Sequence, residues 1–190
     1  MSTLAVDSIT DAVGSGAPAF PNGVSGNIVS TGALTATGIY LGGTGSANLL
    51  DDYEEGYHLT SITCGSSGSI TLSATQRYLS YTKIGNRVFV SGKIDIASIS
   101  SPIGYMAVSL PFSIDSTSVP SGNDSRRFAG TIWVTGASGI DTTHFALYGI
   151  EGESIVRIYN ANGTSIATNS ANAMTAVGNG MNLNFNYRTA

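Results

Sequence analysis

The chain has 190 residues and a formal net charge of −4, and only 11% of its residues are charged. It contains 24 Gly, 26 Ser and 20 Thr but few of the straight-chain residues that surface helices prefer, which excludes a mainly helical protein. Its 42% apolar content argues against charge-driven disorder. Its eight scattered basic residues argue against nucleic-acid binding, which requires a basic patch.

Targeting signals are not apparent in the sequence. The opening residues, Met1 to Asp7, contain no Lys or Arg and no long apolar run, which argues against a secretory signal. No stretch approaches the roughly 18–20 apolar residues that span a bilayer, so we expect no membrane insertion. The single cysteine, Cys64, excludes an internal disulfide and a cysteine-clustered zinc site. We expect a chain made in a cytoplasm that needs neither a cofactor nor a metal.

Charge divides the sequence into three parts. Residues 1–50 contain two Asp and no basic residue, residues 51–56 contain four acids, and residues 57–190 carry a charge of +2. We interpret these parts as an N-terminal arm or short shaft (1–50), an acidic joint (51–56) and a head domain (57–190).

The arm is too poor in large apolar residues to fold by itself. Its apolar side chains occur singly or in pairs, so burial cannot offset an ordering cost of roughly 1–2 kcal/mol per residue. Gly26, Gly32 and Gly38 are spaced six residues apart and close two short apolar units. Such units are stable only when they stack on copies, which stacking between chains about a symmetry axis would allow. The alternative is a Gly-rich arm in which this spacing is a coincidence.

Alternation of apolar and polar residues predicts a β-sandwich or jelly roll in residues 57–190. Met181–Tyr187 alternates apolar residues with Asn, and Arg87–Ile96 places Val88, Val90, Ile94 and Ile96 on one face. Turn signals at Gly85–Asn86, Ser101–Pro102, Pro120–Asn123, Ser138–Gly139, Gly152 and Asn162–Gly163 separate the elements. Further strands are expected at 69–75, 78–84, 105–112, 128–135, 145–150 and 155–160. At most one helical turn is expected, within 169–180.

The sequence offers no convincing catalytic residue. His58 and Cys64 could form a nucleophile pair, but nothing nearby supports one. No Gly-x-Ser-x-Gly motif occurs, and the Gly-rich segments 14–16 and 42–46 lack the context of a phosphate loop. We therefore expect a protein that is not an enzyme.

The acidic run Asp51–Glu55 has three interpretations. Paired carboxylates can hydrolyse glycosides, but adjacent residues of an extended chain point in opposite directions. Clustered carboxylates could also bind a cation where several chains meet. The favoured interpretation is a solvated junction between the arm and the head.

Four aromatic residues are the remaining candidates for ligand binding: Tyr105, Trp133, Tyr148 and Tyr159. Trp133 is expected on the face opposite to Ile132 and Val134. Aromatic faces suit carbohydrate or protein contacts at an exposed surface. The alternative, which we favour for each residue taken singly, is burial in the core or between subunits.

Three stretches of the chain resemble bacteriophage tail-fibre and virion structural proteins. The opening, 1–10 and 16–24, is similar to many of their N-termini, and Leu50–Gly56 (LDDYEEG) is similar to the acidic element before their terminal β-domain. Arg77–Tyr78, Tyr81–Gly92 and Leu110–Phe112 are similar to the first sheet of that domain. The resemblance spans roughly residues 1–112 and is architectural, so it identifies no ligand.

The resemblance implies a homotrimer whose arm docks on the virion and whose β-rich head projects. The anchoring residues would be the spaced apolar side chains of the arm: Leu4, Val6, Ile9, Val13 and Phe20. A closed trimer also suits a strand-rich chain, because symmetry covers strand edges that would otherwise recruit other chains. The implied partners are sister copies, virion proteins of the tail or baseplate or the major capsid protein, and a host-surface glycan. The implied location is the virion, after synthesis in the bacterial host.

The leading hypothesis is a short trimeric tail fibre that presents its head to the host surface. The chain is short for a long shaft or for the large β-helix of polysaccharide-degrading tailspikes. One alternative is therefore a trimeric decoration or cement protein of the phage capsid. A glycan-active enzyme is a minor alternative.

Overall fold

The computed structural model describes residues 38–41, 45–117, 128–135, 145–161, 166–167, 171, 178 and 180–190. The chain divides into two units, Met1–Thr37 and Gly38–Ala190, and the first lies outside the described residues. The expected anchoring residues Leu4, Val6, Ile9, Val13 and Phe20 therefore fall outside the description, as do Gly26 and Gly32 of the six-residue repeat.

A small hairpin opens the second unit. Strands β1 (Ile39–Tyr40) and β2 (Leu49–Leu50) pair antiparallel and are joined through the short 3₁₀ helix η1 (Ser46–Asn48). The Leu41 N–H donates to the Asn48 carbonyl at 2.8 Å and closes the hairpin. Ile39, Tyr40 and Leu41 are exposed.

The main sheet of the described residues has 11 strands, and all of its paired strands are antiparallel. The strands are β3 (Tyr53–Leu59), β4 (Ile62–Cys64), β5 (Ser67–Leu72), β6 (Tyr78–Ile84), β7 (Arg87–Ile103), β8 (Met106–Ser109), β9 (Phe128–Thr135), β10 (Phe145–Gly149), β11 (Ile155–Ala161), β12 (Ile166–Ala167) and β13 (Gly180–Arg188). Their order is β3-β6-β7-β13-β9-β10-β11-β8-β4, with β12 beside β11 and β5 beside β7.

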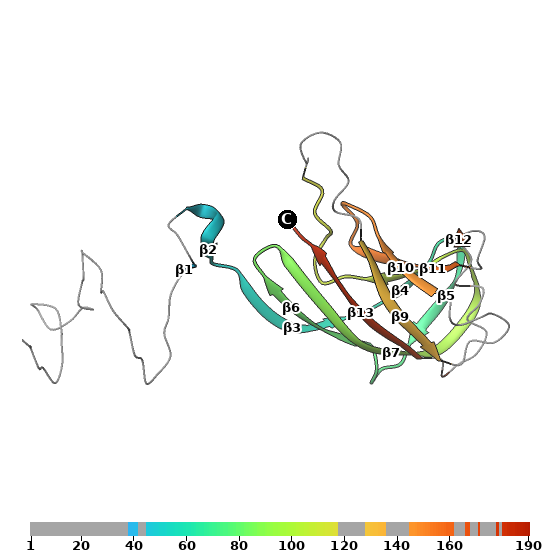
Figure 1. The fold of residues 1–190 in the computed structure, drawn as a ribbon. Coiled ribbons are helices and arrows are strands. Elements are labelled where there is room, and N and C mark those ends of the chain that lie inside the picture. The colour runs from blue at the N-terminus through green and yellow to red at the C-terminus, as the bar shows by residue number, and fades with distance from the viewer. Residues whose placement is uncertain are drawn as a thin grey trace, which may run out of the picture. The chain divides into compact units, whose positions relative to one another are not determined.

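The sheet curls because two of its strands change partners along their length (Figure 1). Residues 87–95 of β7 pair with β13, whereas residues 96–103 pair with β5. Likewise, residues 131–135 of β9 pair with β13 and residues 128–130 pair with β10. One buried hydrophobic cluster contains side chains of β6, β7, β9 and β13 together with side chains of β4, β5, β8, β10 and β11. The all-β prediction is confirmed, and the two faces expected of a sandwich are parts of one continuous sheet.

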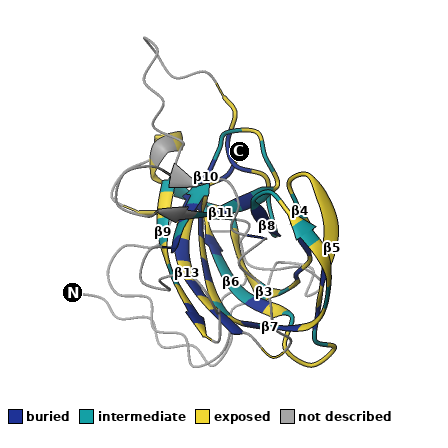
Figure 2. Cartoon of the chain, turned by 90° about the vertical axis from the view of Figure 1, so that its right-hand side faces the viewer, coloured by how far each residue is buried: buried dark blue, intermediate teal, exposed yellow. Residues whose placement is uncertain are grey.

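The predicted alternation is confirmed in the strands that form the core. Along β13, Met181, Leu183, Phe185 and Tyr187 are buried, whereas the three intervening Asn residues are exposed (Figure 2). Val88, Val90, Ile94 and Ile96 of β7 are also buried, as predicted. This alternation places one face of each strand against apolar neighbours and leaves the other face free for a functional surface.

The expected turn at Ser101–Pro102 is wrong, because β7 continues to Ile103. The register between β5 and β7 shifts between Ser67 and Ser69, where Gly68 has φ +79°. A Cβ atom at Gly68 would lie 2.1 Å from the Ser101 carbonyl oxygen, so only glycine fits. An irregularity of this kind bends a strand without ending it.

Other predicted boundaries of strands and turns agree more closely with the structure. β6 and β9 begin and end at the predicted residues, and turns occur as expected at Gly85–Asn86 and Gly152. The seven-residue strand β3 and the short strands β4 and β12 were not predicted from the sequence. The expected turns at 120–123, 138–139 and 162–163, and most of 169–180, lie outside the described residues.

A stack of aromatic rings fills the part of the core where β9 and β13 meet. Phe128 lies over Phe185 and Tyr187, with ring centroids 5.6 and 5.5 Å apart. The Tyr187 hydroxyl donates to the Phe112 carbonyl at 2.9 Å and accepts from the Phe112 N–H at 3.2 Å. Burial raises the pKa of Tyr187 well above its ordinary value, and the hydrogen bond to Phe112 opposes this only in part. The hydroxyl is therefore a neutral hydrogen-bonding group within the core.

Candidate functional site

The two residues considered as a nucleophile pair are not arranged as one. His58 lies on β3, and its Nε2 atom is 2.9 Å from the hydroxyl oxygen of Ser109. Cys64 is half-buried on β4, and burial raises the pKa of its thiol, which disfavours the reactive thiolate.

Among the described residues, no group of three or more His, Cys, Asp or Glu side chains is placed to hold a metal ion. The described part of the chain also contains no helix long and apolar enough to span a membrane.

Part of the acidic run belongs to strand β3, and most of its side chains are solvent-exposed. Strand β3 begins at Tyr53, and the exposed Asp51 precedes it. Asp52 forms an ion pair with Lys83, which lies on the buried face of β6. Glu54 accepts a hydrogen bond from the Tyr81 hydroxyl. Carboxylates are accommodated at a strand edge when the neighbouring strand supplies an ammonium or hydroxyl group.

Three of the four predicted aromatic candidates come together in the structure. Tyr148 lies on β10, Tyr159 lies on β11, and Tyr105 immediately precedes β8. The Tyr159 ring lies 5.9 Å from that of Tyr148 and 6.4 Å from that of Tyr105, measured between centroids. All three side chains are half-buried on the outer side of the β10–β11–β8 part of the sheet. Trp133 is not part of this group and lies 68% exposed on β9.

A charged pair completes this group, and neither of its members was predicted. The Arg157 guanidinium lies over the Tyr105 ring, 4.8 Å from its centroid, and forms an ion pair with Glu153. Burial alone would lower the pKa of Arg157, but its hydrogen bonds with Tyr159 and Glu153 outweigh burial and raise it. The side chains of Tyr105, Tyr148, Tyr159, Arg157 and Glu153 are called here the Tyr–Arg cluster.

Local backbone geometry positions the Tyr105 ring. A Cβ atom at Gly65 would lie 2.6 Å from two carbons of this ring, so the ring lies directly over the glycine backbone. The Gly65 N–H donates to the Tyr105 carbonyl at 2.8 Å. Gly104, with φ +97°, provides the left-handed turn that leads into Tyr105. Two glycines thus fix the side of the cluster formed by Tyr105.

Spacing on β11 is the sequence signal that could have identified Arg157. Arg157 and Tyr159 are two residues apart on one strand and therefore share a face. The register also pairs Arg157 with Tyr148 on β10 and with Ala107 on β8. The contact with Tyr105 depends on β8 pairing with β11, and no pattern along the chain reveals that pairing.

A second candidate surface is the outer face of β3, β6, β7, β13 and β9. Its exposed large side chains are Tyr53, Tyr57, Leu59, Tyr78, Ile84, Phe89 and Trp133. Between them, β13 presents Asn182, Asn184 and Asn186. The register places Asn182 directly opposite Trp133. This face therefore combines aromatic side chains with amide groups that can both donate and accept hydrogen bonds.

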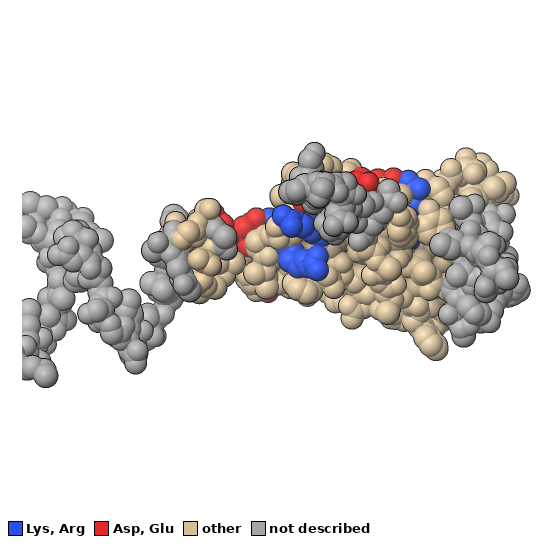
Figure 3. All heavy atoms as spheres, turned by 45° about the horizontal axis from the view of Figure 1, so that its top comes forward, with Lys and Arg blue, Asp and Glu red and all other residues tan. Residues whose placement is uncertain are grey.

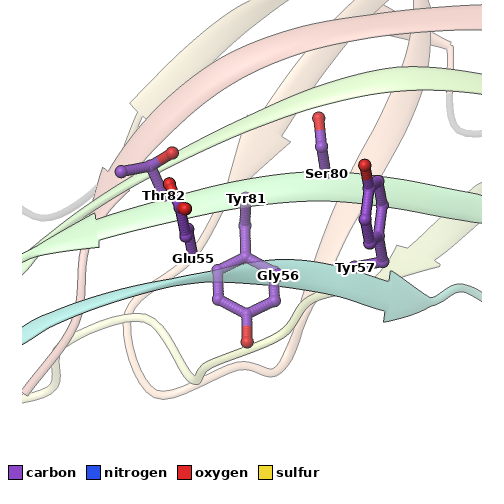
Figure 4. Close-up of a pocket in the computed structure, with 6 residues that line it drawn as sticks. All are labelled: Glu55, Gly56, Tyr57, Ser80, Tyr81 and Thr82. Carbon is purple, nitrogen blue, oxygen red and sulfur yellow. The ribbon is translucent and has the colours of Figure 1, made fainter.

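A shallow depression of about 360 Å³ lies between β3 and β6 on this surface. It is lined by Glu55, Gly56, Tyr57, Ser80, Tyr81 and Thr82. Figure 4 shows the Tyr81 ring pointing away from the side chains of Tyr57, Ser80 and Thr82. The depression is open and contains no buried ionisable group, so it offers a contact surface and not a reaction chamber.

Among the described residues on the face shown in Figure 3, most are neither acidic nor basic. The sequence as a whole has 11% charged residues. Contacts made by such a surface depend on aromatic packing and neutral hydrogen bonds, which salt screens little.

No protein-family model and no curated protein sequence matches the chain. Among solved structures, the Dettilon tailspike protein (gp208) is similar, with a TM-score of 0.52 and 20% sequence identity. The similar region covers 72% of this chain but 24% of the tailspike chain. At this identity the shared property is the fold. The chain thus has a fold similar to that of one part, about a quarter, of a tailspike protein.

Proposed function

We propose that the chain is a bacteriophage virion structural protein, a short trimeric tail fibre that is attached by its N-terminal arm. Its head would bind a glycan on the host surface. The observation that carries this proposal is the similarity in fold to the tailspike protein over 72% of the chain. The resemblance of residues 1–112 to tail-fibre proteins agrees with it. We propose no catalytic activity, because the described residues offer aromatic and amide surfaces in place of a nucleophile–base pair.

Quantitative mass spectrometry of purified virions tests this proposal. We expect the chain in a few copies per particle, recovered with tail fragments after mild disruption. A copy number that scales with the major capsid protein would instead identify a decoration or cement protein. Absence from the particles would overturn the virion proposal as a whole.

The trimer has a separate test. Sedimentation equilibrium at micromolar concentration should give three times the chain mass of 19.5 kDa. The physical reason is that residues 1–50 have too little apolar bulk to fold alone and would bury their side chains against sister copies. A monomer mass under these conditions would contradict the trimer.

Deletion of residues 1–50 tests the role of the arm. The truncated chain should remain soluble and keep its strand content, because the main sheet begins at Tyr53. It should also fail to enter particles when it replaces the full chain during phage growth. Incorporation of the truncated chain at the normal level would show that the anchor lies elsewhere.

A further inference from the structure

We infer that the outer face of the sheet binds a neutral oligosaccharide, which begins in the depression between β3 and β6 and runs across the strands toward β9. This inference rests on the proposed function, because it assigns the host-surface glycan to one surface and one chemical class. It concerns the outer face of β3, β6, β7, β13 and β9, and not the Tyr–Arg cluster.

The proposed site is a row of side chains that the strand register places side by side. Tyr57 on β3 is opposite Ser80 on β6, and Ser80 is opposite Ser91 on β7. Asn184 on β13 is opposite both Ser91 and Thr131 on β9. These residues are called here the hydroxyl–amide row: Tyr57, Ser80, Ser91, Asn184 and Thr131. At the usual strand spacing of about 4.8 Å the row is about 19 Å long, so it can contact several sugar units in line.

The depression gives the β3 end of the row a cavity of about 360 Å³. Sites for small molecules typically measure roughly 300–1,000 Å³. Tyr57 is 79% exposed, and its side chain lies on the same side of the two strands as those of Ser80 and Thr82 (Figure 4). The apolar face of a sugar ring can therefore pack on the Tyr57 ring while its hydroxyls meet those of Ser80 and Thr82. Because the depression is open, the rest of the oligosaccharide can continue along the row.

Hydrogen bonds to the backbone of neighbouring strands orient two hydroxyls of the row. The Ser80 hydroxyl donates to the Ser91 carbonyl at 2.8 Å, and the Thr131 hydroxyl donates to the Asn184 carbonyl at 3.1 Å. Their oxygens keep lone pairs that can accept from a sugar hydroxyl, and the exposed Asn184 amide can both donate and accept. Groups that are already oriented lose less conformational freedom when a ligand binds.

The composition of the row favours a glycan over a second copy of the chain. The cores of protein–protein interfaces are enriched in aromatic residues and depleted in serine. Here small hydroxyl and amide groups form the centre, and the exposed rings of Phe89 and Trp133 lie at the next outward positions of β7 and β9. A polar strip bordered by aromatic rings matches a chain of sugars, which presents hydroxyl groups and apolar ring faces.

Charge selects among glycans. No member of the row has a formal charge at neutral pH, and Glu55 is the one charged residue among the six that line the depression. Its carboxylate accepts from the Tyr53 hydroxyl at 2.8 Å, but a neutral donor leaves the negative charge uncompensated. An acidic sugar in the depression would be repelled by Glu55, whereas a neutral sugar can donate a hydrogen bond to it.

The test is calorimetric titration of the full chain with neutral hexose oligomers, from dimer to hexamer, and with uronic-acid oligomers of the same lengths. At least one neutral series should bind, and its affinity should increase with length, because longer oligomers cover more of the row. The uronic-acid series should bind about fivefold more weakly or less. No binding by any neutral series, tighter binding of uronic acids, or an affinity independent of length would each overturn the inference.

Two variants locate the ligand along the row. Tyr57→Ala should lower the affinity of every oligomer by about tenfold or more, because it removes the ring in the depression. Asn184→Ala should lower the affinity of the hexamer by about fivefold and that of the dimer by less than about twofold, since the depression holds the first units. Tyr40→Ala and Asn48→Ala are the matched controls, exposed residues of the β1–β2 hairpin, and should change neither affinity by more than about twofold. Equal losses in variants and controls would contradict the assignment.

Two further measurements separate binding from folding and assembly. Tyr57 and Asn184 are exposed, so the melting temperatures of both variants should stay within a few degrees of the parent chain. Sedimentation equilibrium should give both variants the same mass as the parent chain. A lower mass with unchanged sugar binding would identify this face as an interface between copies. A loss of sugar binding in Tyr148→Ala alone would place the site at the Tyr–Arg cluster, and either result would overturn the inference.

These outcomes are independent of those that decide the virion proposal. A phage that carries Tyr57→Ala should contain the chain at its normal copy number and adsorb poorly to its host. Normal adsorption by that phage would defeat the site assignment and leave the virion proposal standing. Absence of the parent chain from virions would defeat the virion proposal even if the purified chain binds sugars.

Discussion

His58 and Ser109 join two distant parts of the strand order. His58 lies on β3, the first strand in that order, and its Nε2 atom is 2.9 Å from the hydroxyl oxygen of Ser109 on β8, near the other end. The same hydroxyl accepts from the Ser61 N–H at 3.0 Å. One serine side chain thus links β3, the turn after it and β8 across the curled sheet.

This contact predicts that stability decreases in mild acid. Burial lowers the pKa of His58 below its ordinary value of 6.5, and the hydrogen bond with Ser109 opposes burial only in part. As the pH falls through 6.5, the unfolded chain binds a proton at His58 more readily than the folded chain does, so the free energy of unfolding falls. His58→Gln should lack this contribution.

Urea denaturation of both proteins between pH 8 and pH 5 gives the measurement. The stability of the parent chain minus that of His58→Gln should decrease as the pH falls, and this difference cancels the titration of all other groups. A difference that increases toward acid would mean that the fold favours the charged imidazole, contrary to the burial argument.

The ion pair between Asp52 and Lys83 predicts that alanine substitutions at Asp52 and at the adjacent Asp51 change the free energy of unfolding unequally. The Lys83 side chain is 11% exposed, so its ammonium depends on the Asp52 carboxylate. Asp52→Ala should lower the free energy of unfolding by about 1–3 kcal/mol, because it leaves a largely buried charge without its partner. Asp51→Ala, at the exposed neighbouring position, should change it by less than about 0.5 kcal/mol.

Chemical denaturation of the two single variants checks this prediction, and equal effects would contradict it. The comparison also bears on the hydrolase alternative, which would make both carboxylates catalytic. A loss of stability confined to Asp52→Ala would show that this carboxylate stabilises the sheet.

The close contact between Gly149 and the Phe128 ring predicts that a side chain at position 149 would destabilise the aromatic core. A Cβ atom there would lie 1.9 Å from Cε1 of Phe128, whose ring stacks on Phe185 and Tyr187. Gly149→Ala should therefore displace the ring and cost about 1–3 kcal/mol in thermal or urea unfolding. Gly45→Ala is the matched control, since its Cβ meets nothing within 4 Å, and it should leave stability nearly unchanged. Equal stability of the two variants would contradict the packing argument.

The buried positions of strands were predicted well from the sequence where apolar and polar residues alternate. The inward residues of β13 and β7 were identified because one side of each strand packs on the core and the period of two survives in the sequence. Strand β3 was missed because its outward positions carry tyrosine, glutamate and leucine, and its inward positions carry glutamate, glycine and histidine. That composition resembles a polar joint until the pairing with β6 is known.

The candidate site was predicted only in part, for a topological reason. Tyr148 and Tyr159 sit on consecutive strands and could have been placed together by a hairpin argument. Tyr105 joins them because β8 pairs with β11, about 50 residues later in the chain, and antiparallel pairing at that separation has no local signature. Arg157 and Glu153 were overlooked for the same reason, since their importance depends on the ring that Arg157 covers.

Tyr187 provides a test of the link between the C-terminal strand and the segment after β8. Its hydroxyl makes two hydrogen bonds to the backbone of Phe112, and its side chain is fully buried. Tyr187→Phe keeps the ring stack but leaves the Phe112 N–H and carbonyl without this partner, which should cost about 1–3 kcal/mol. Tyr57→Phe, at a side chain that is 79% exposed, should change stability by less than about 0.5 kcal/mol. Thermal unfolding of the two variants under one set of conditions measures the difference. If Tyr187→Phe were as stable as Tyr57→Phe, the buried hydroxyl would contribute nothing net to the free energy of unfolding.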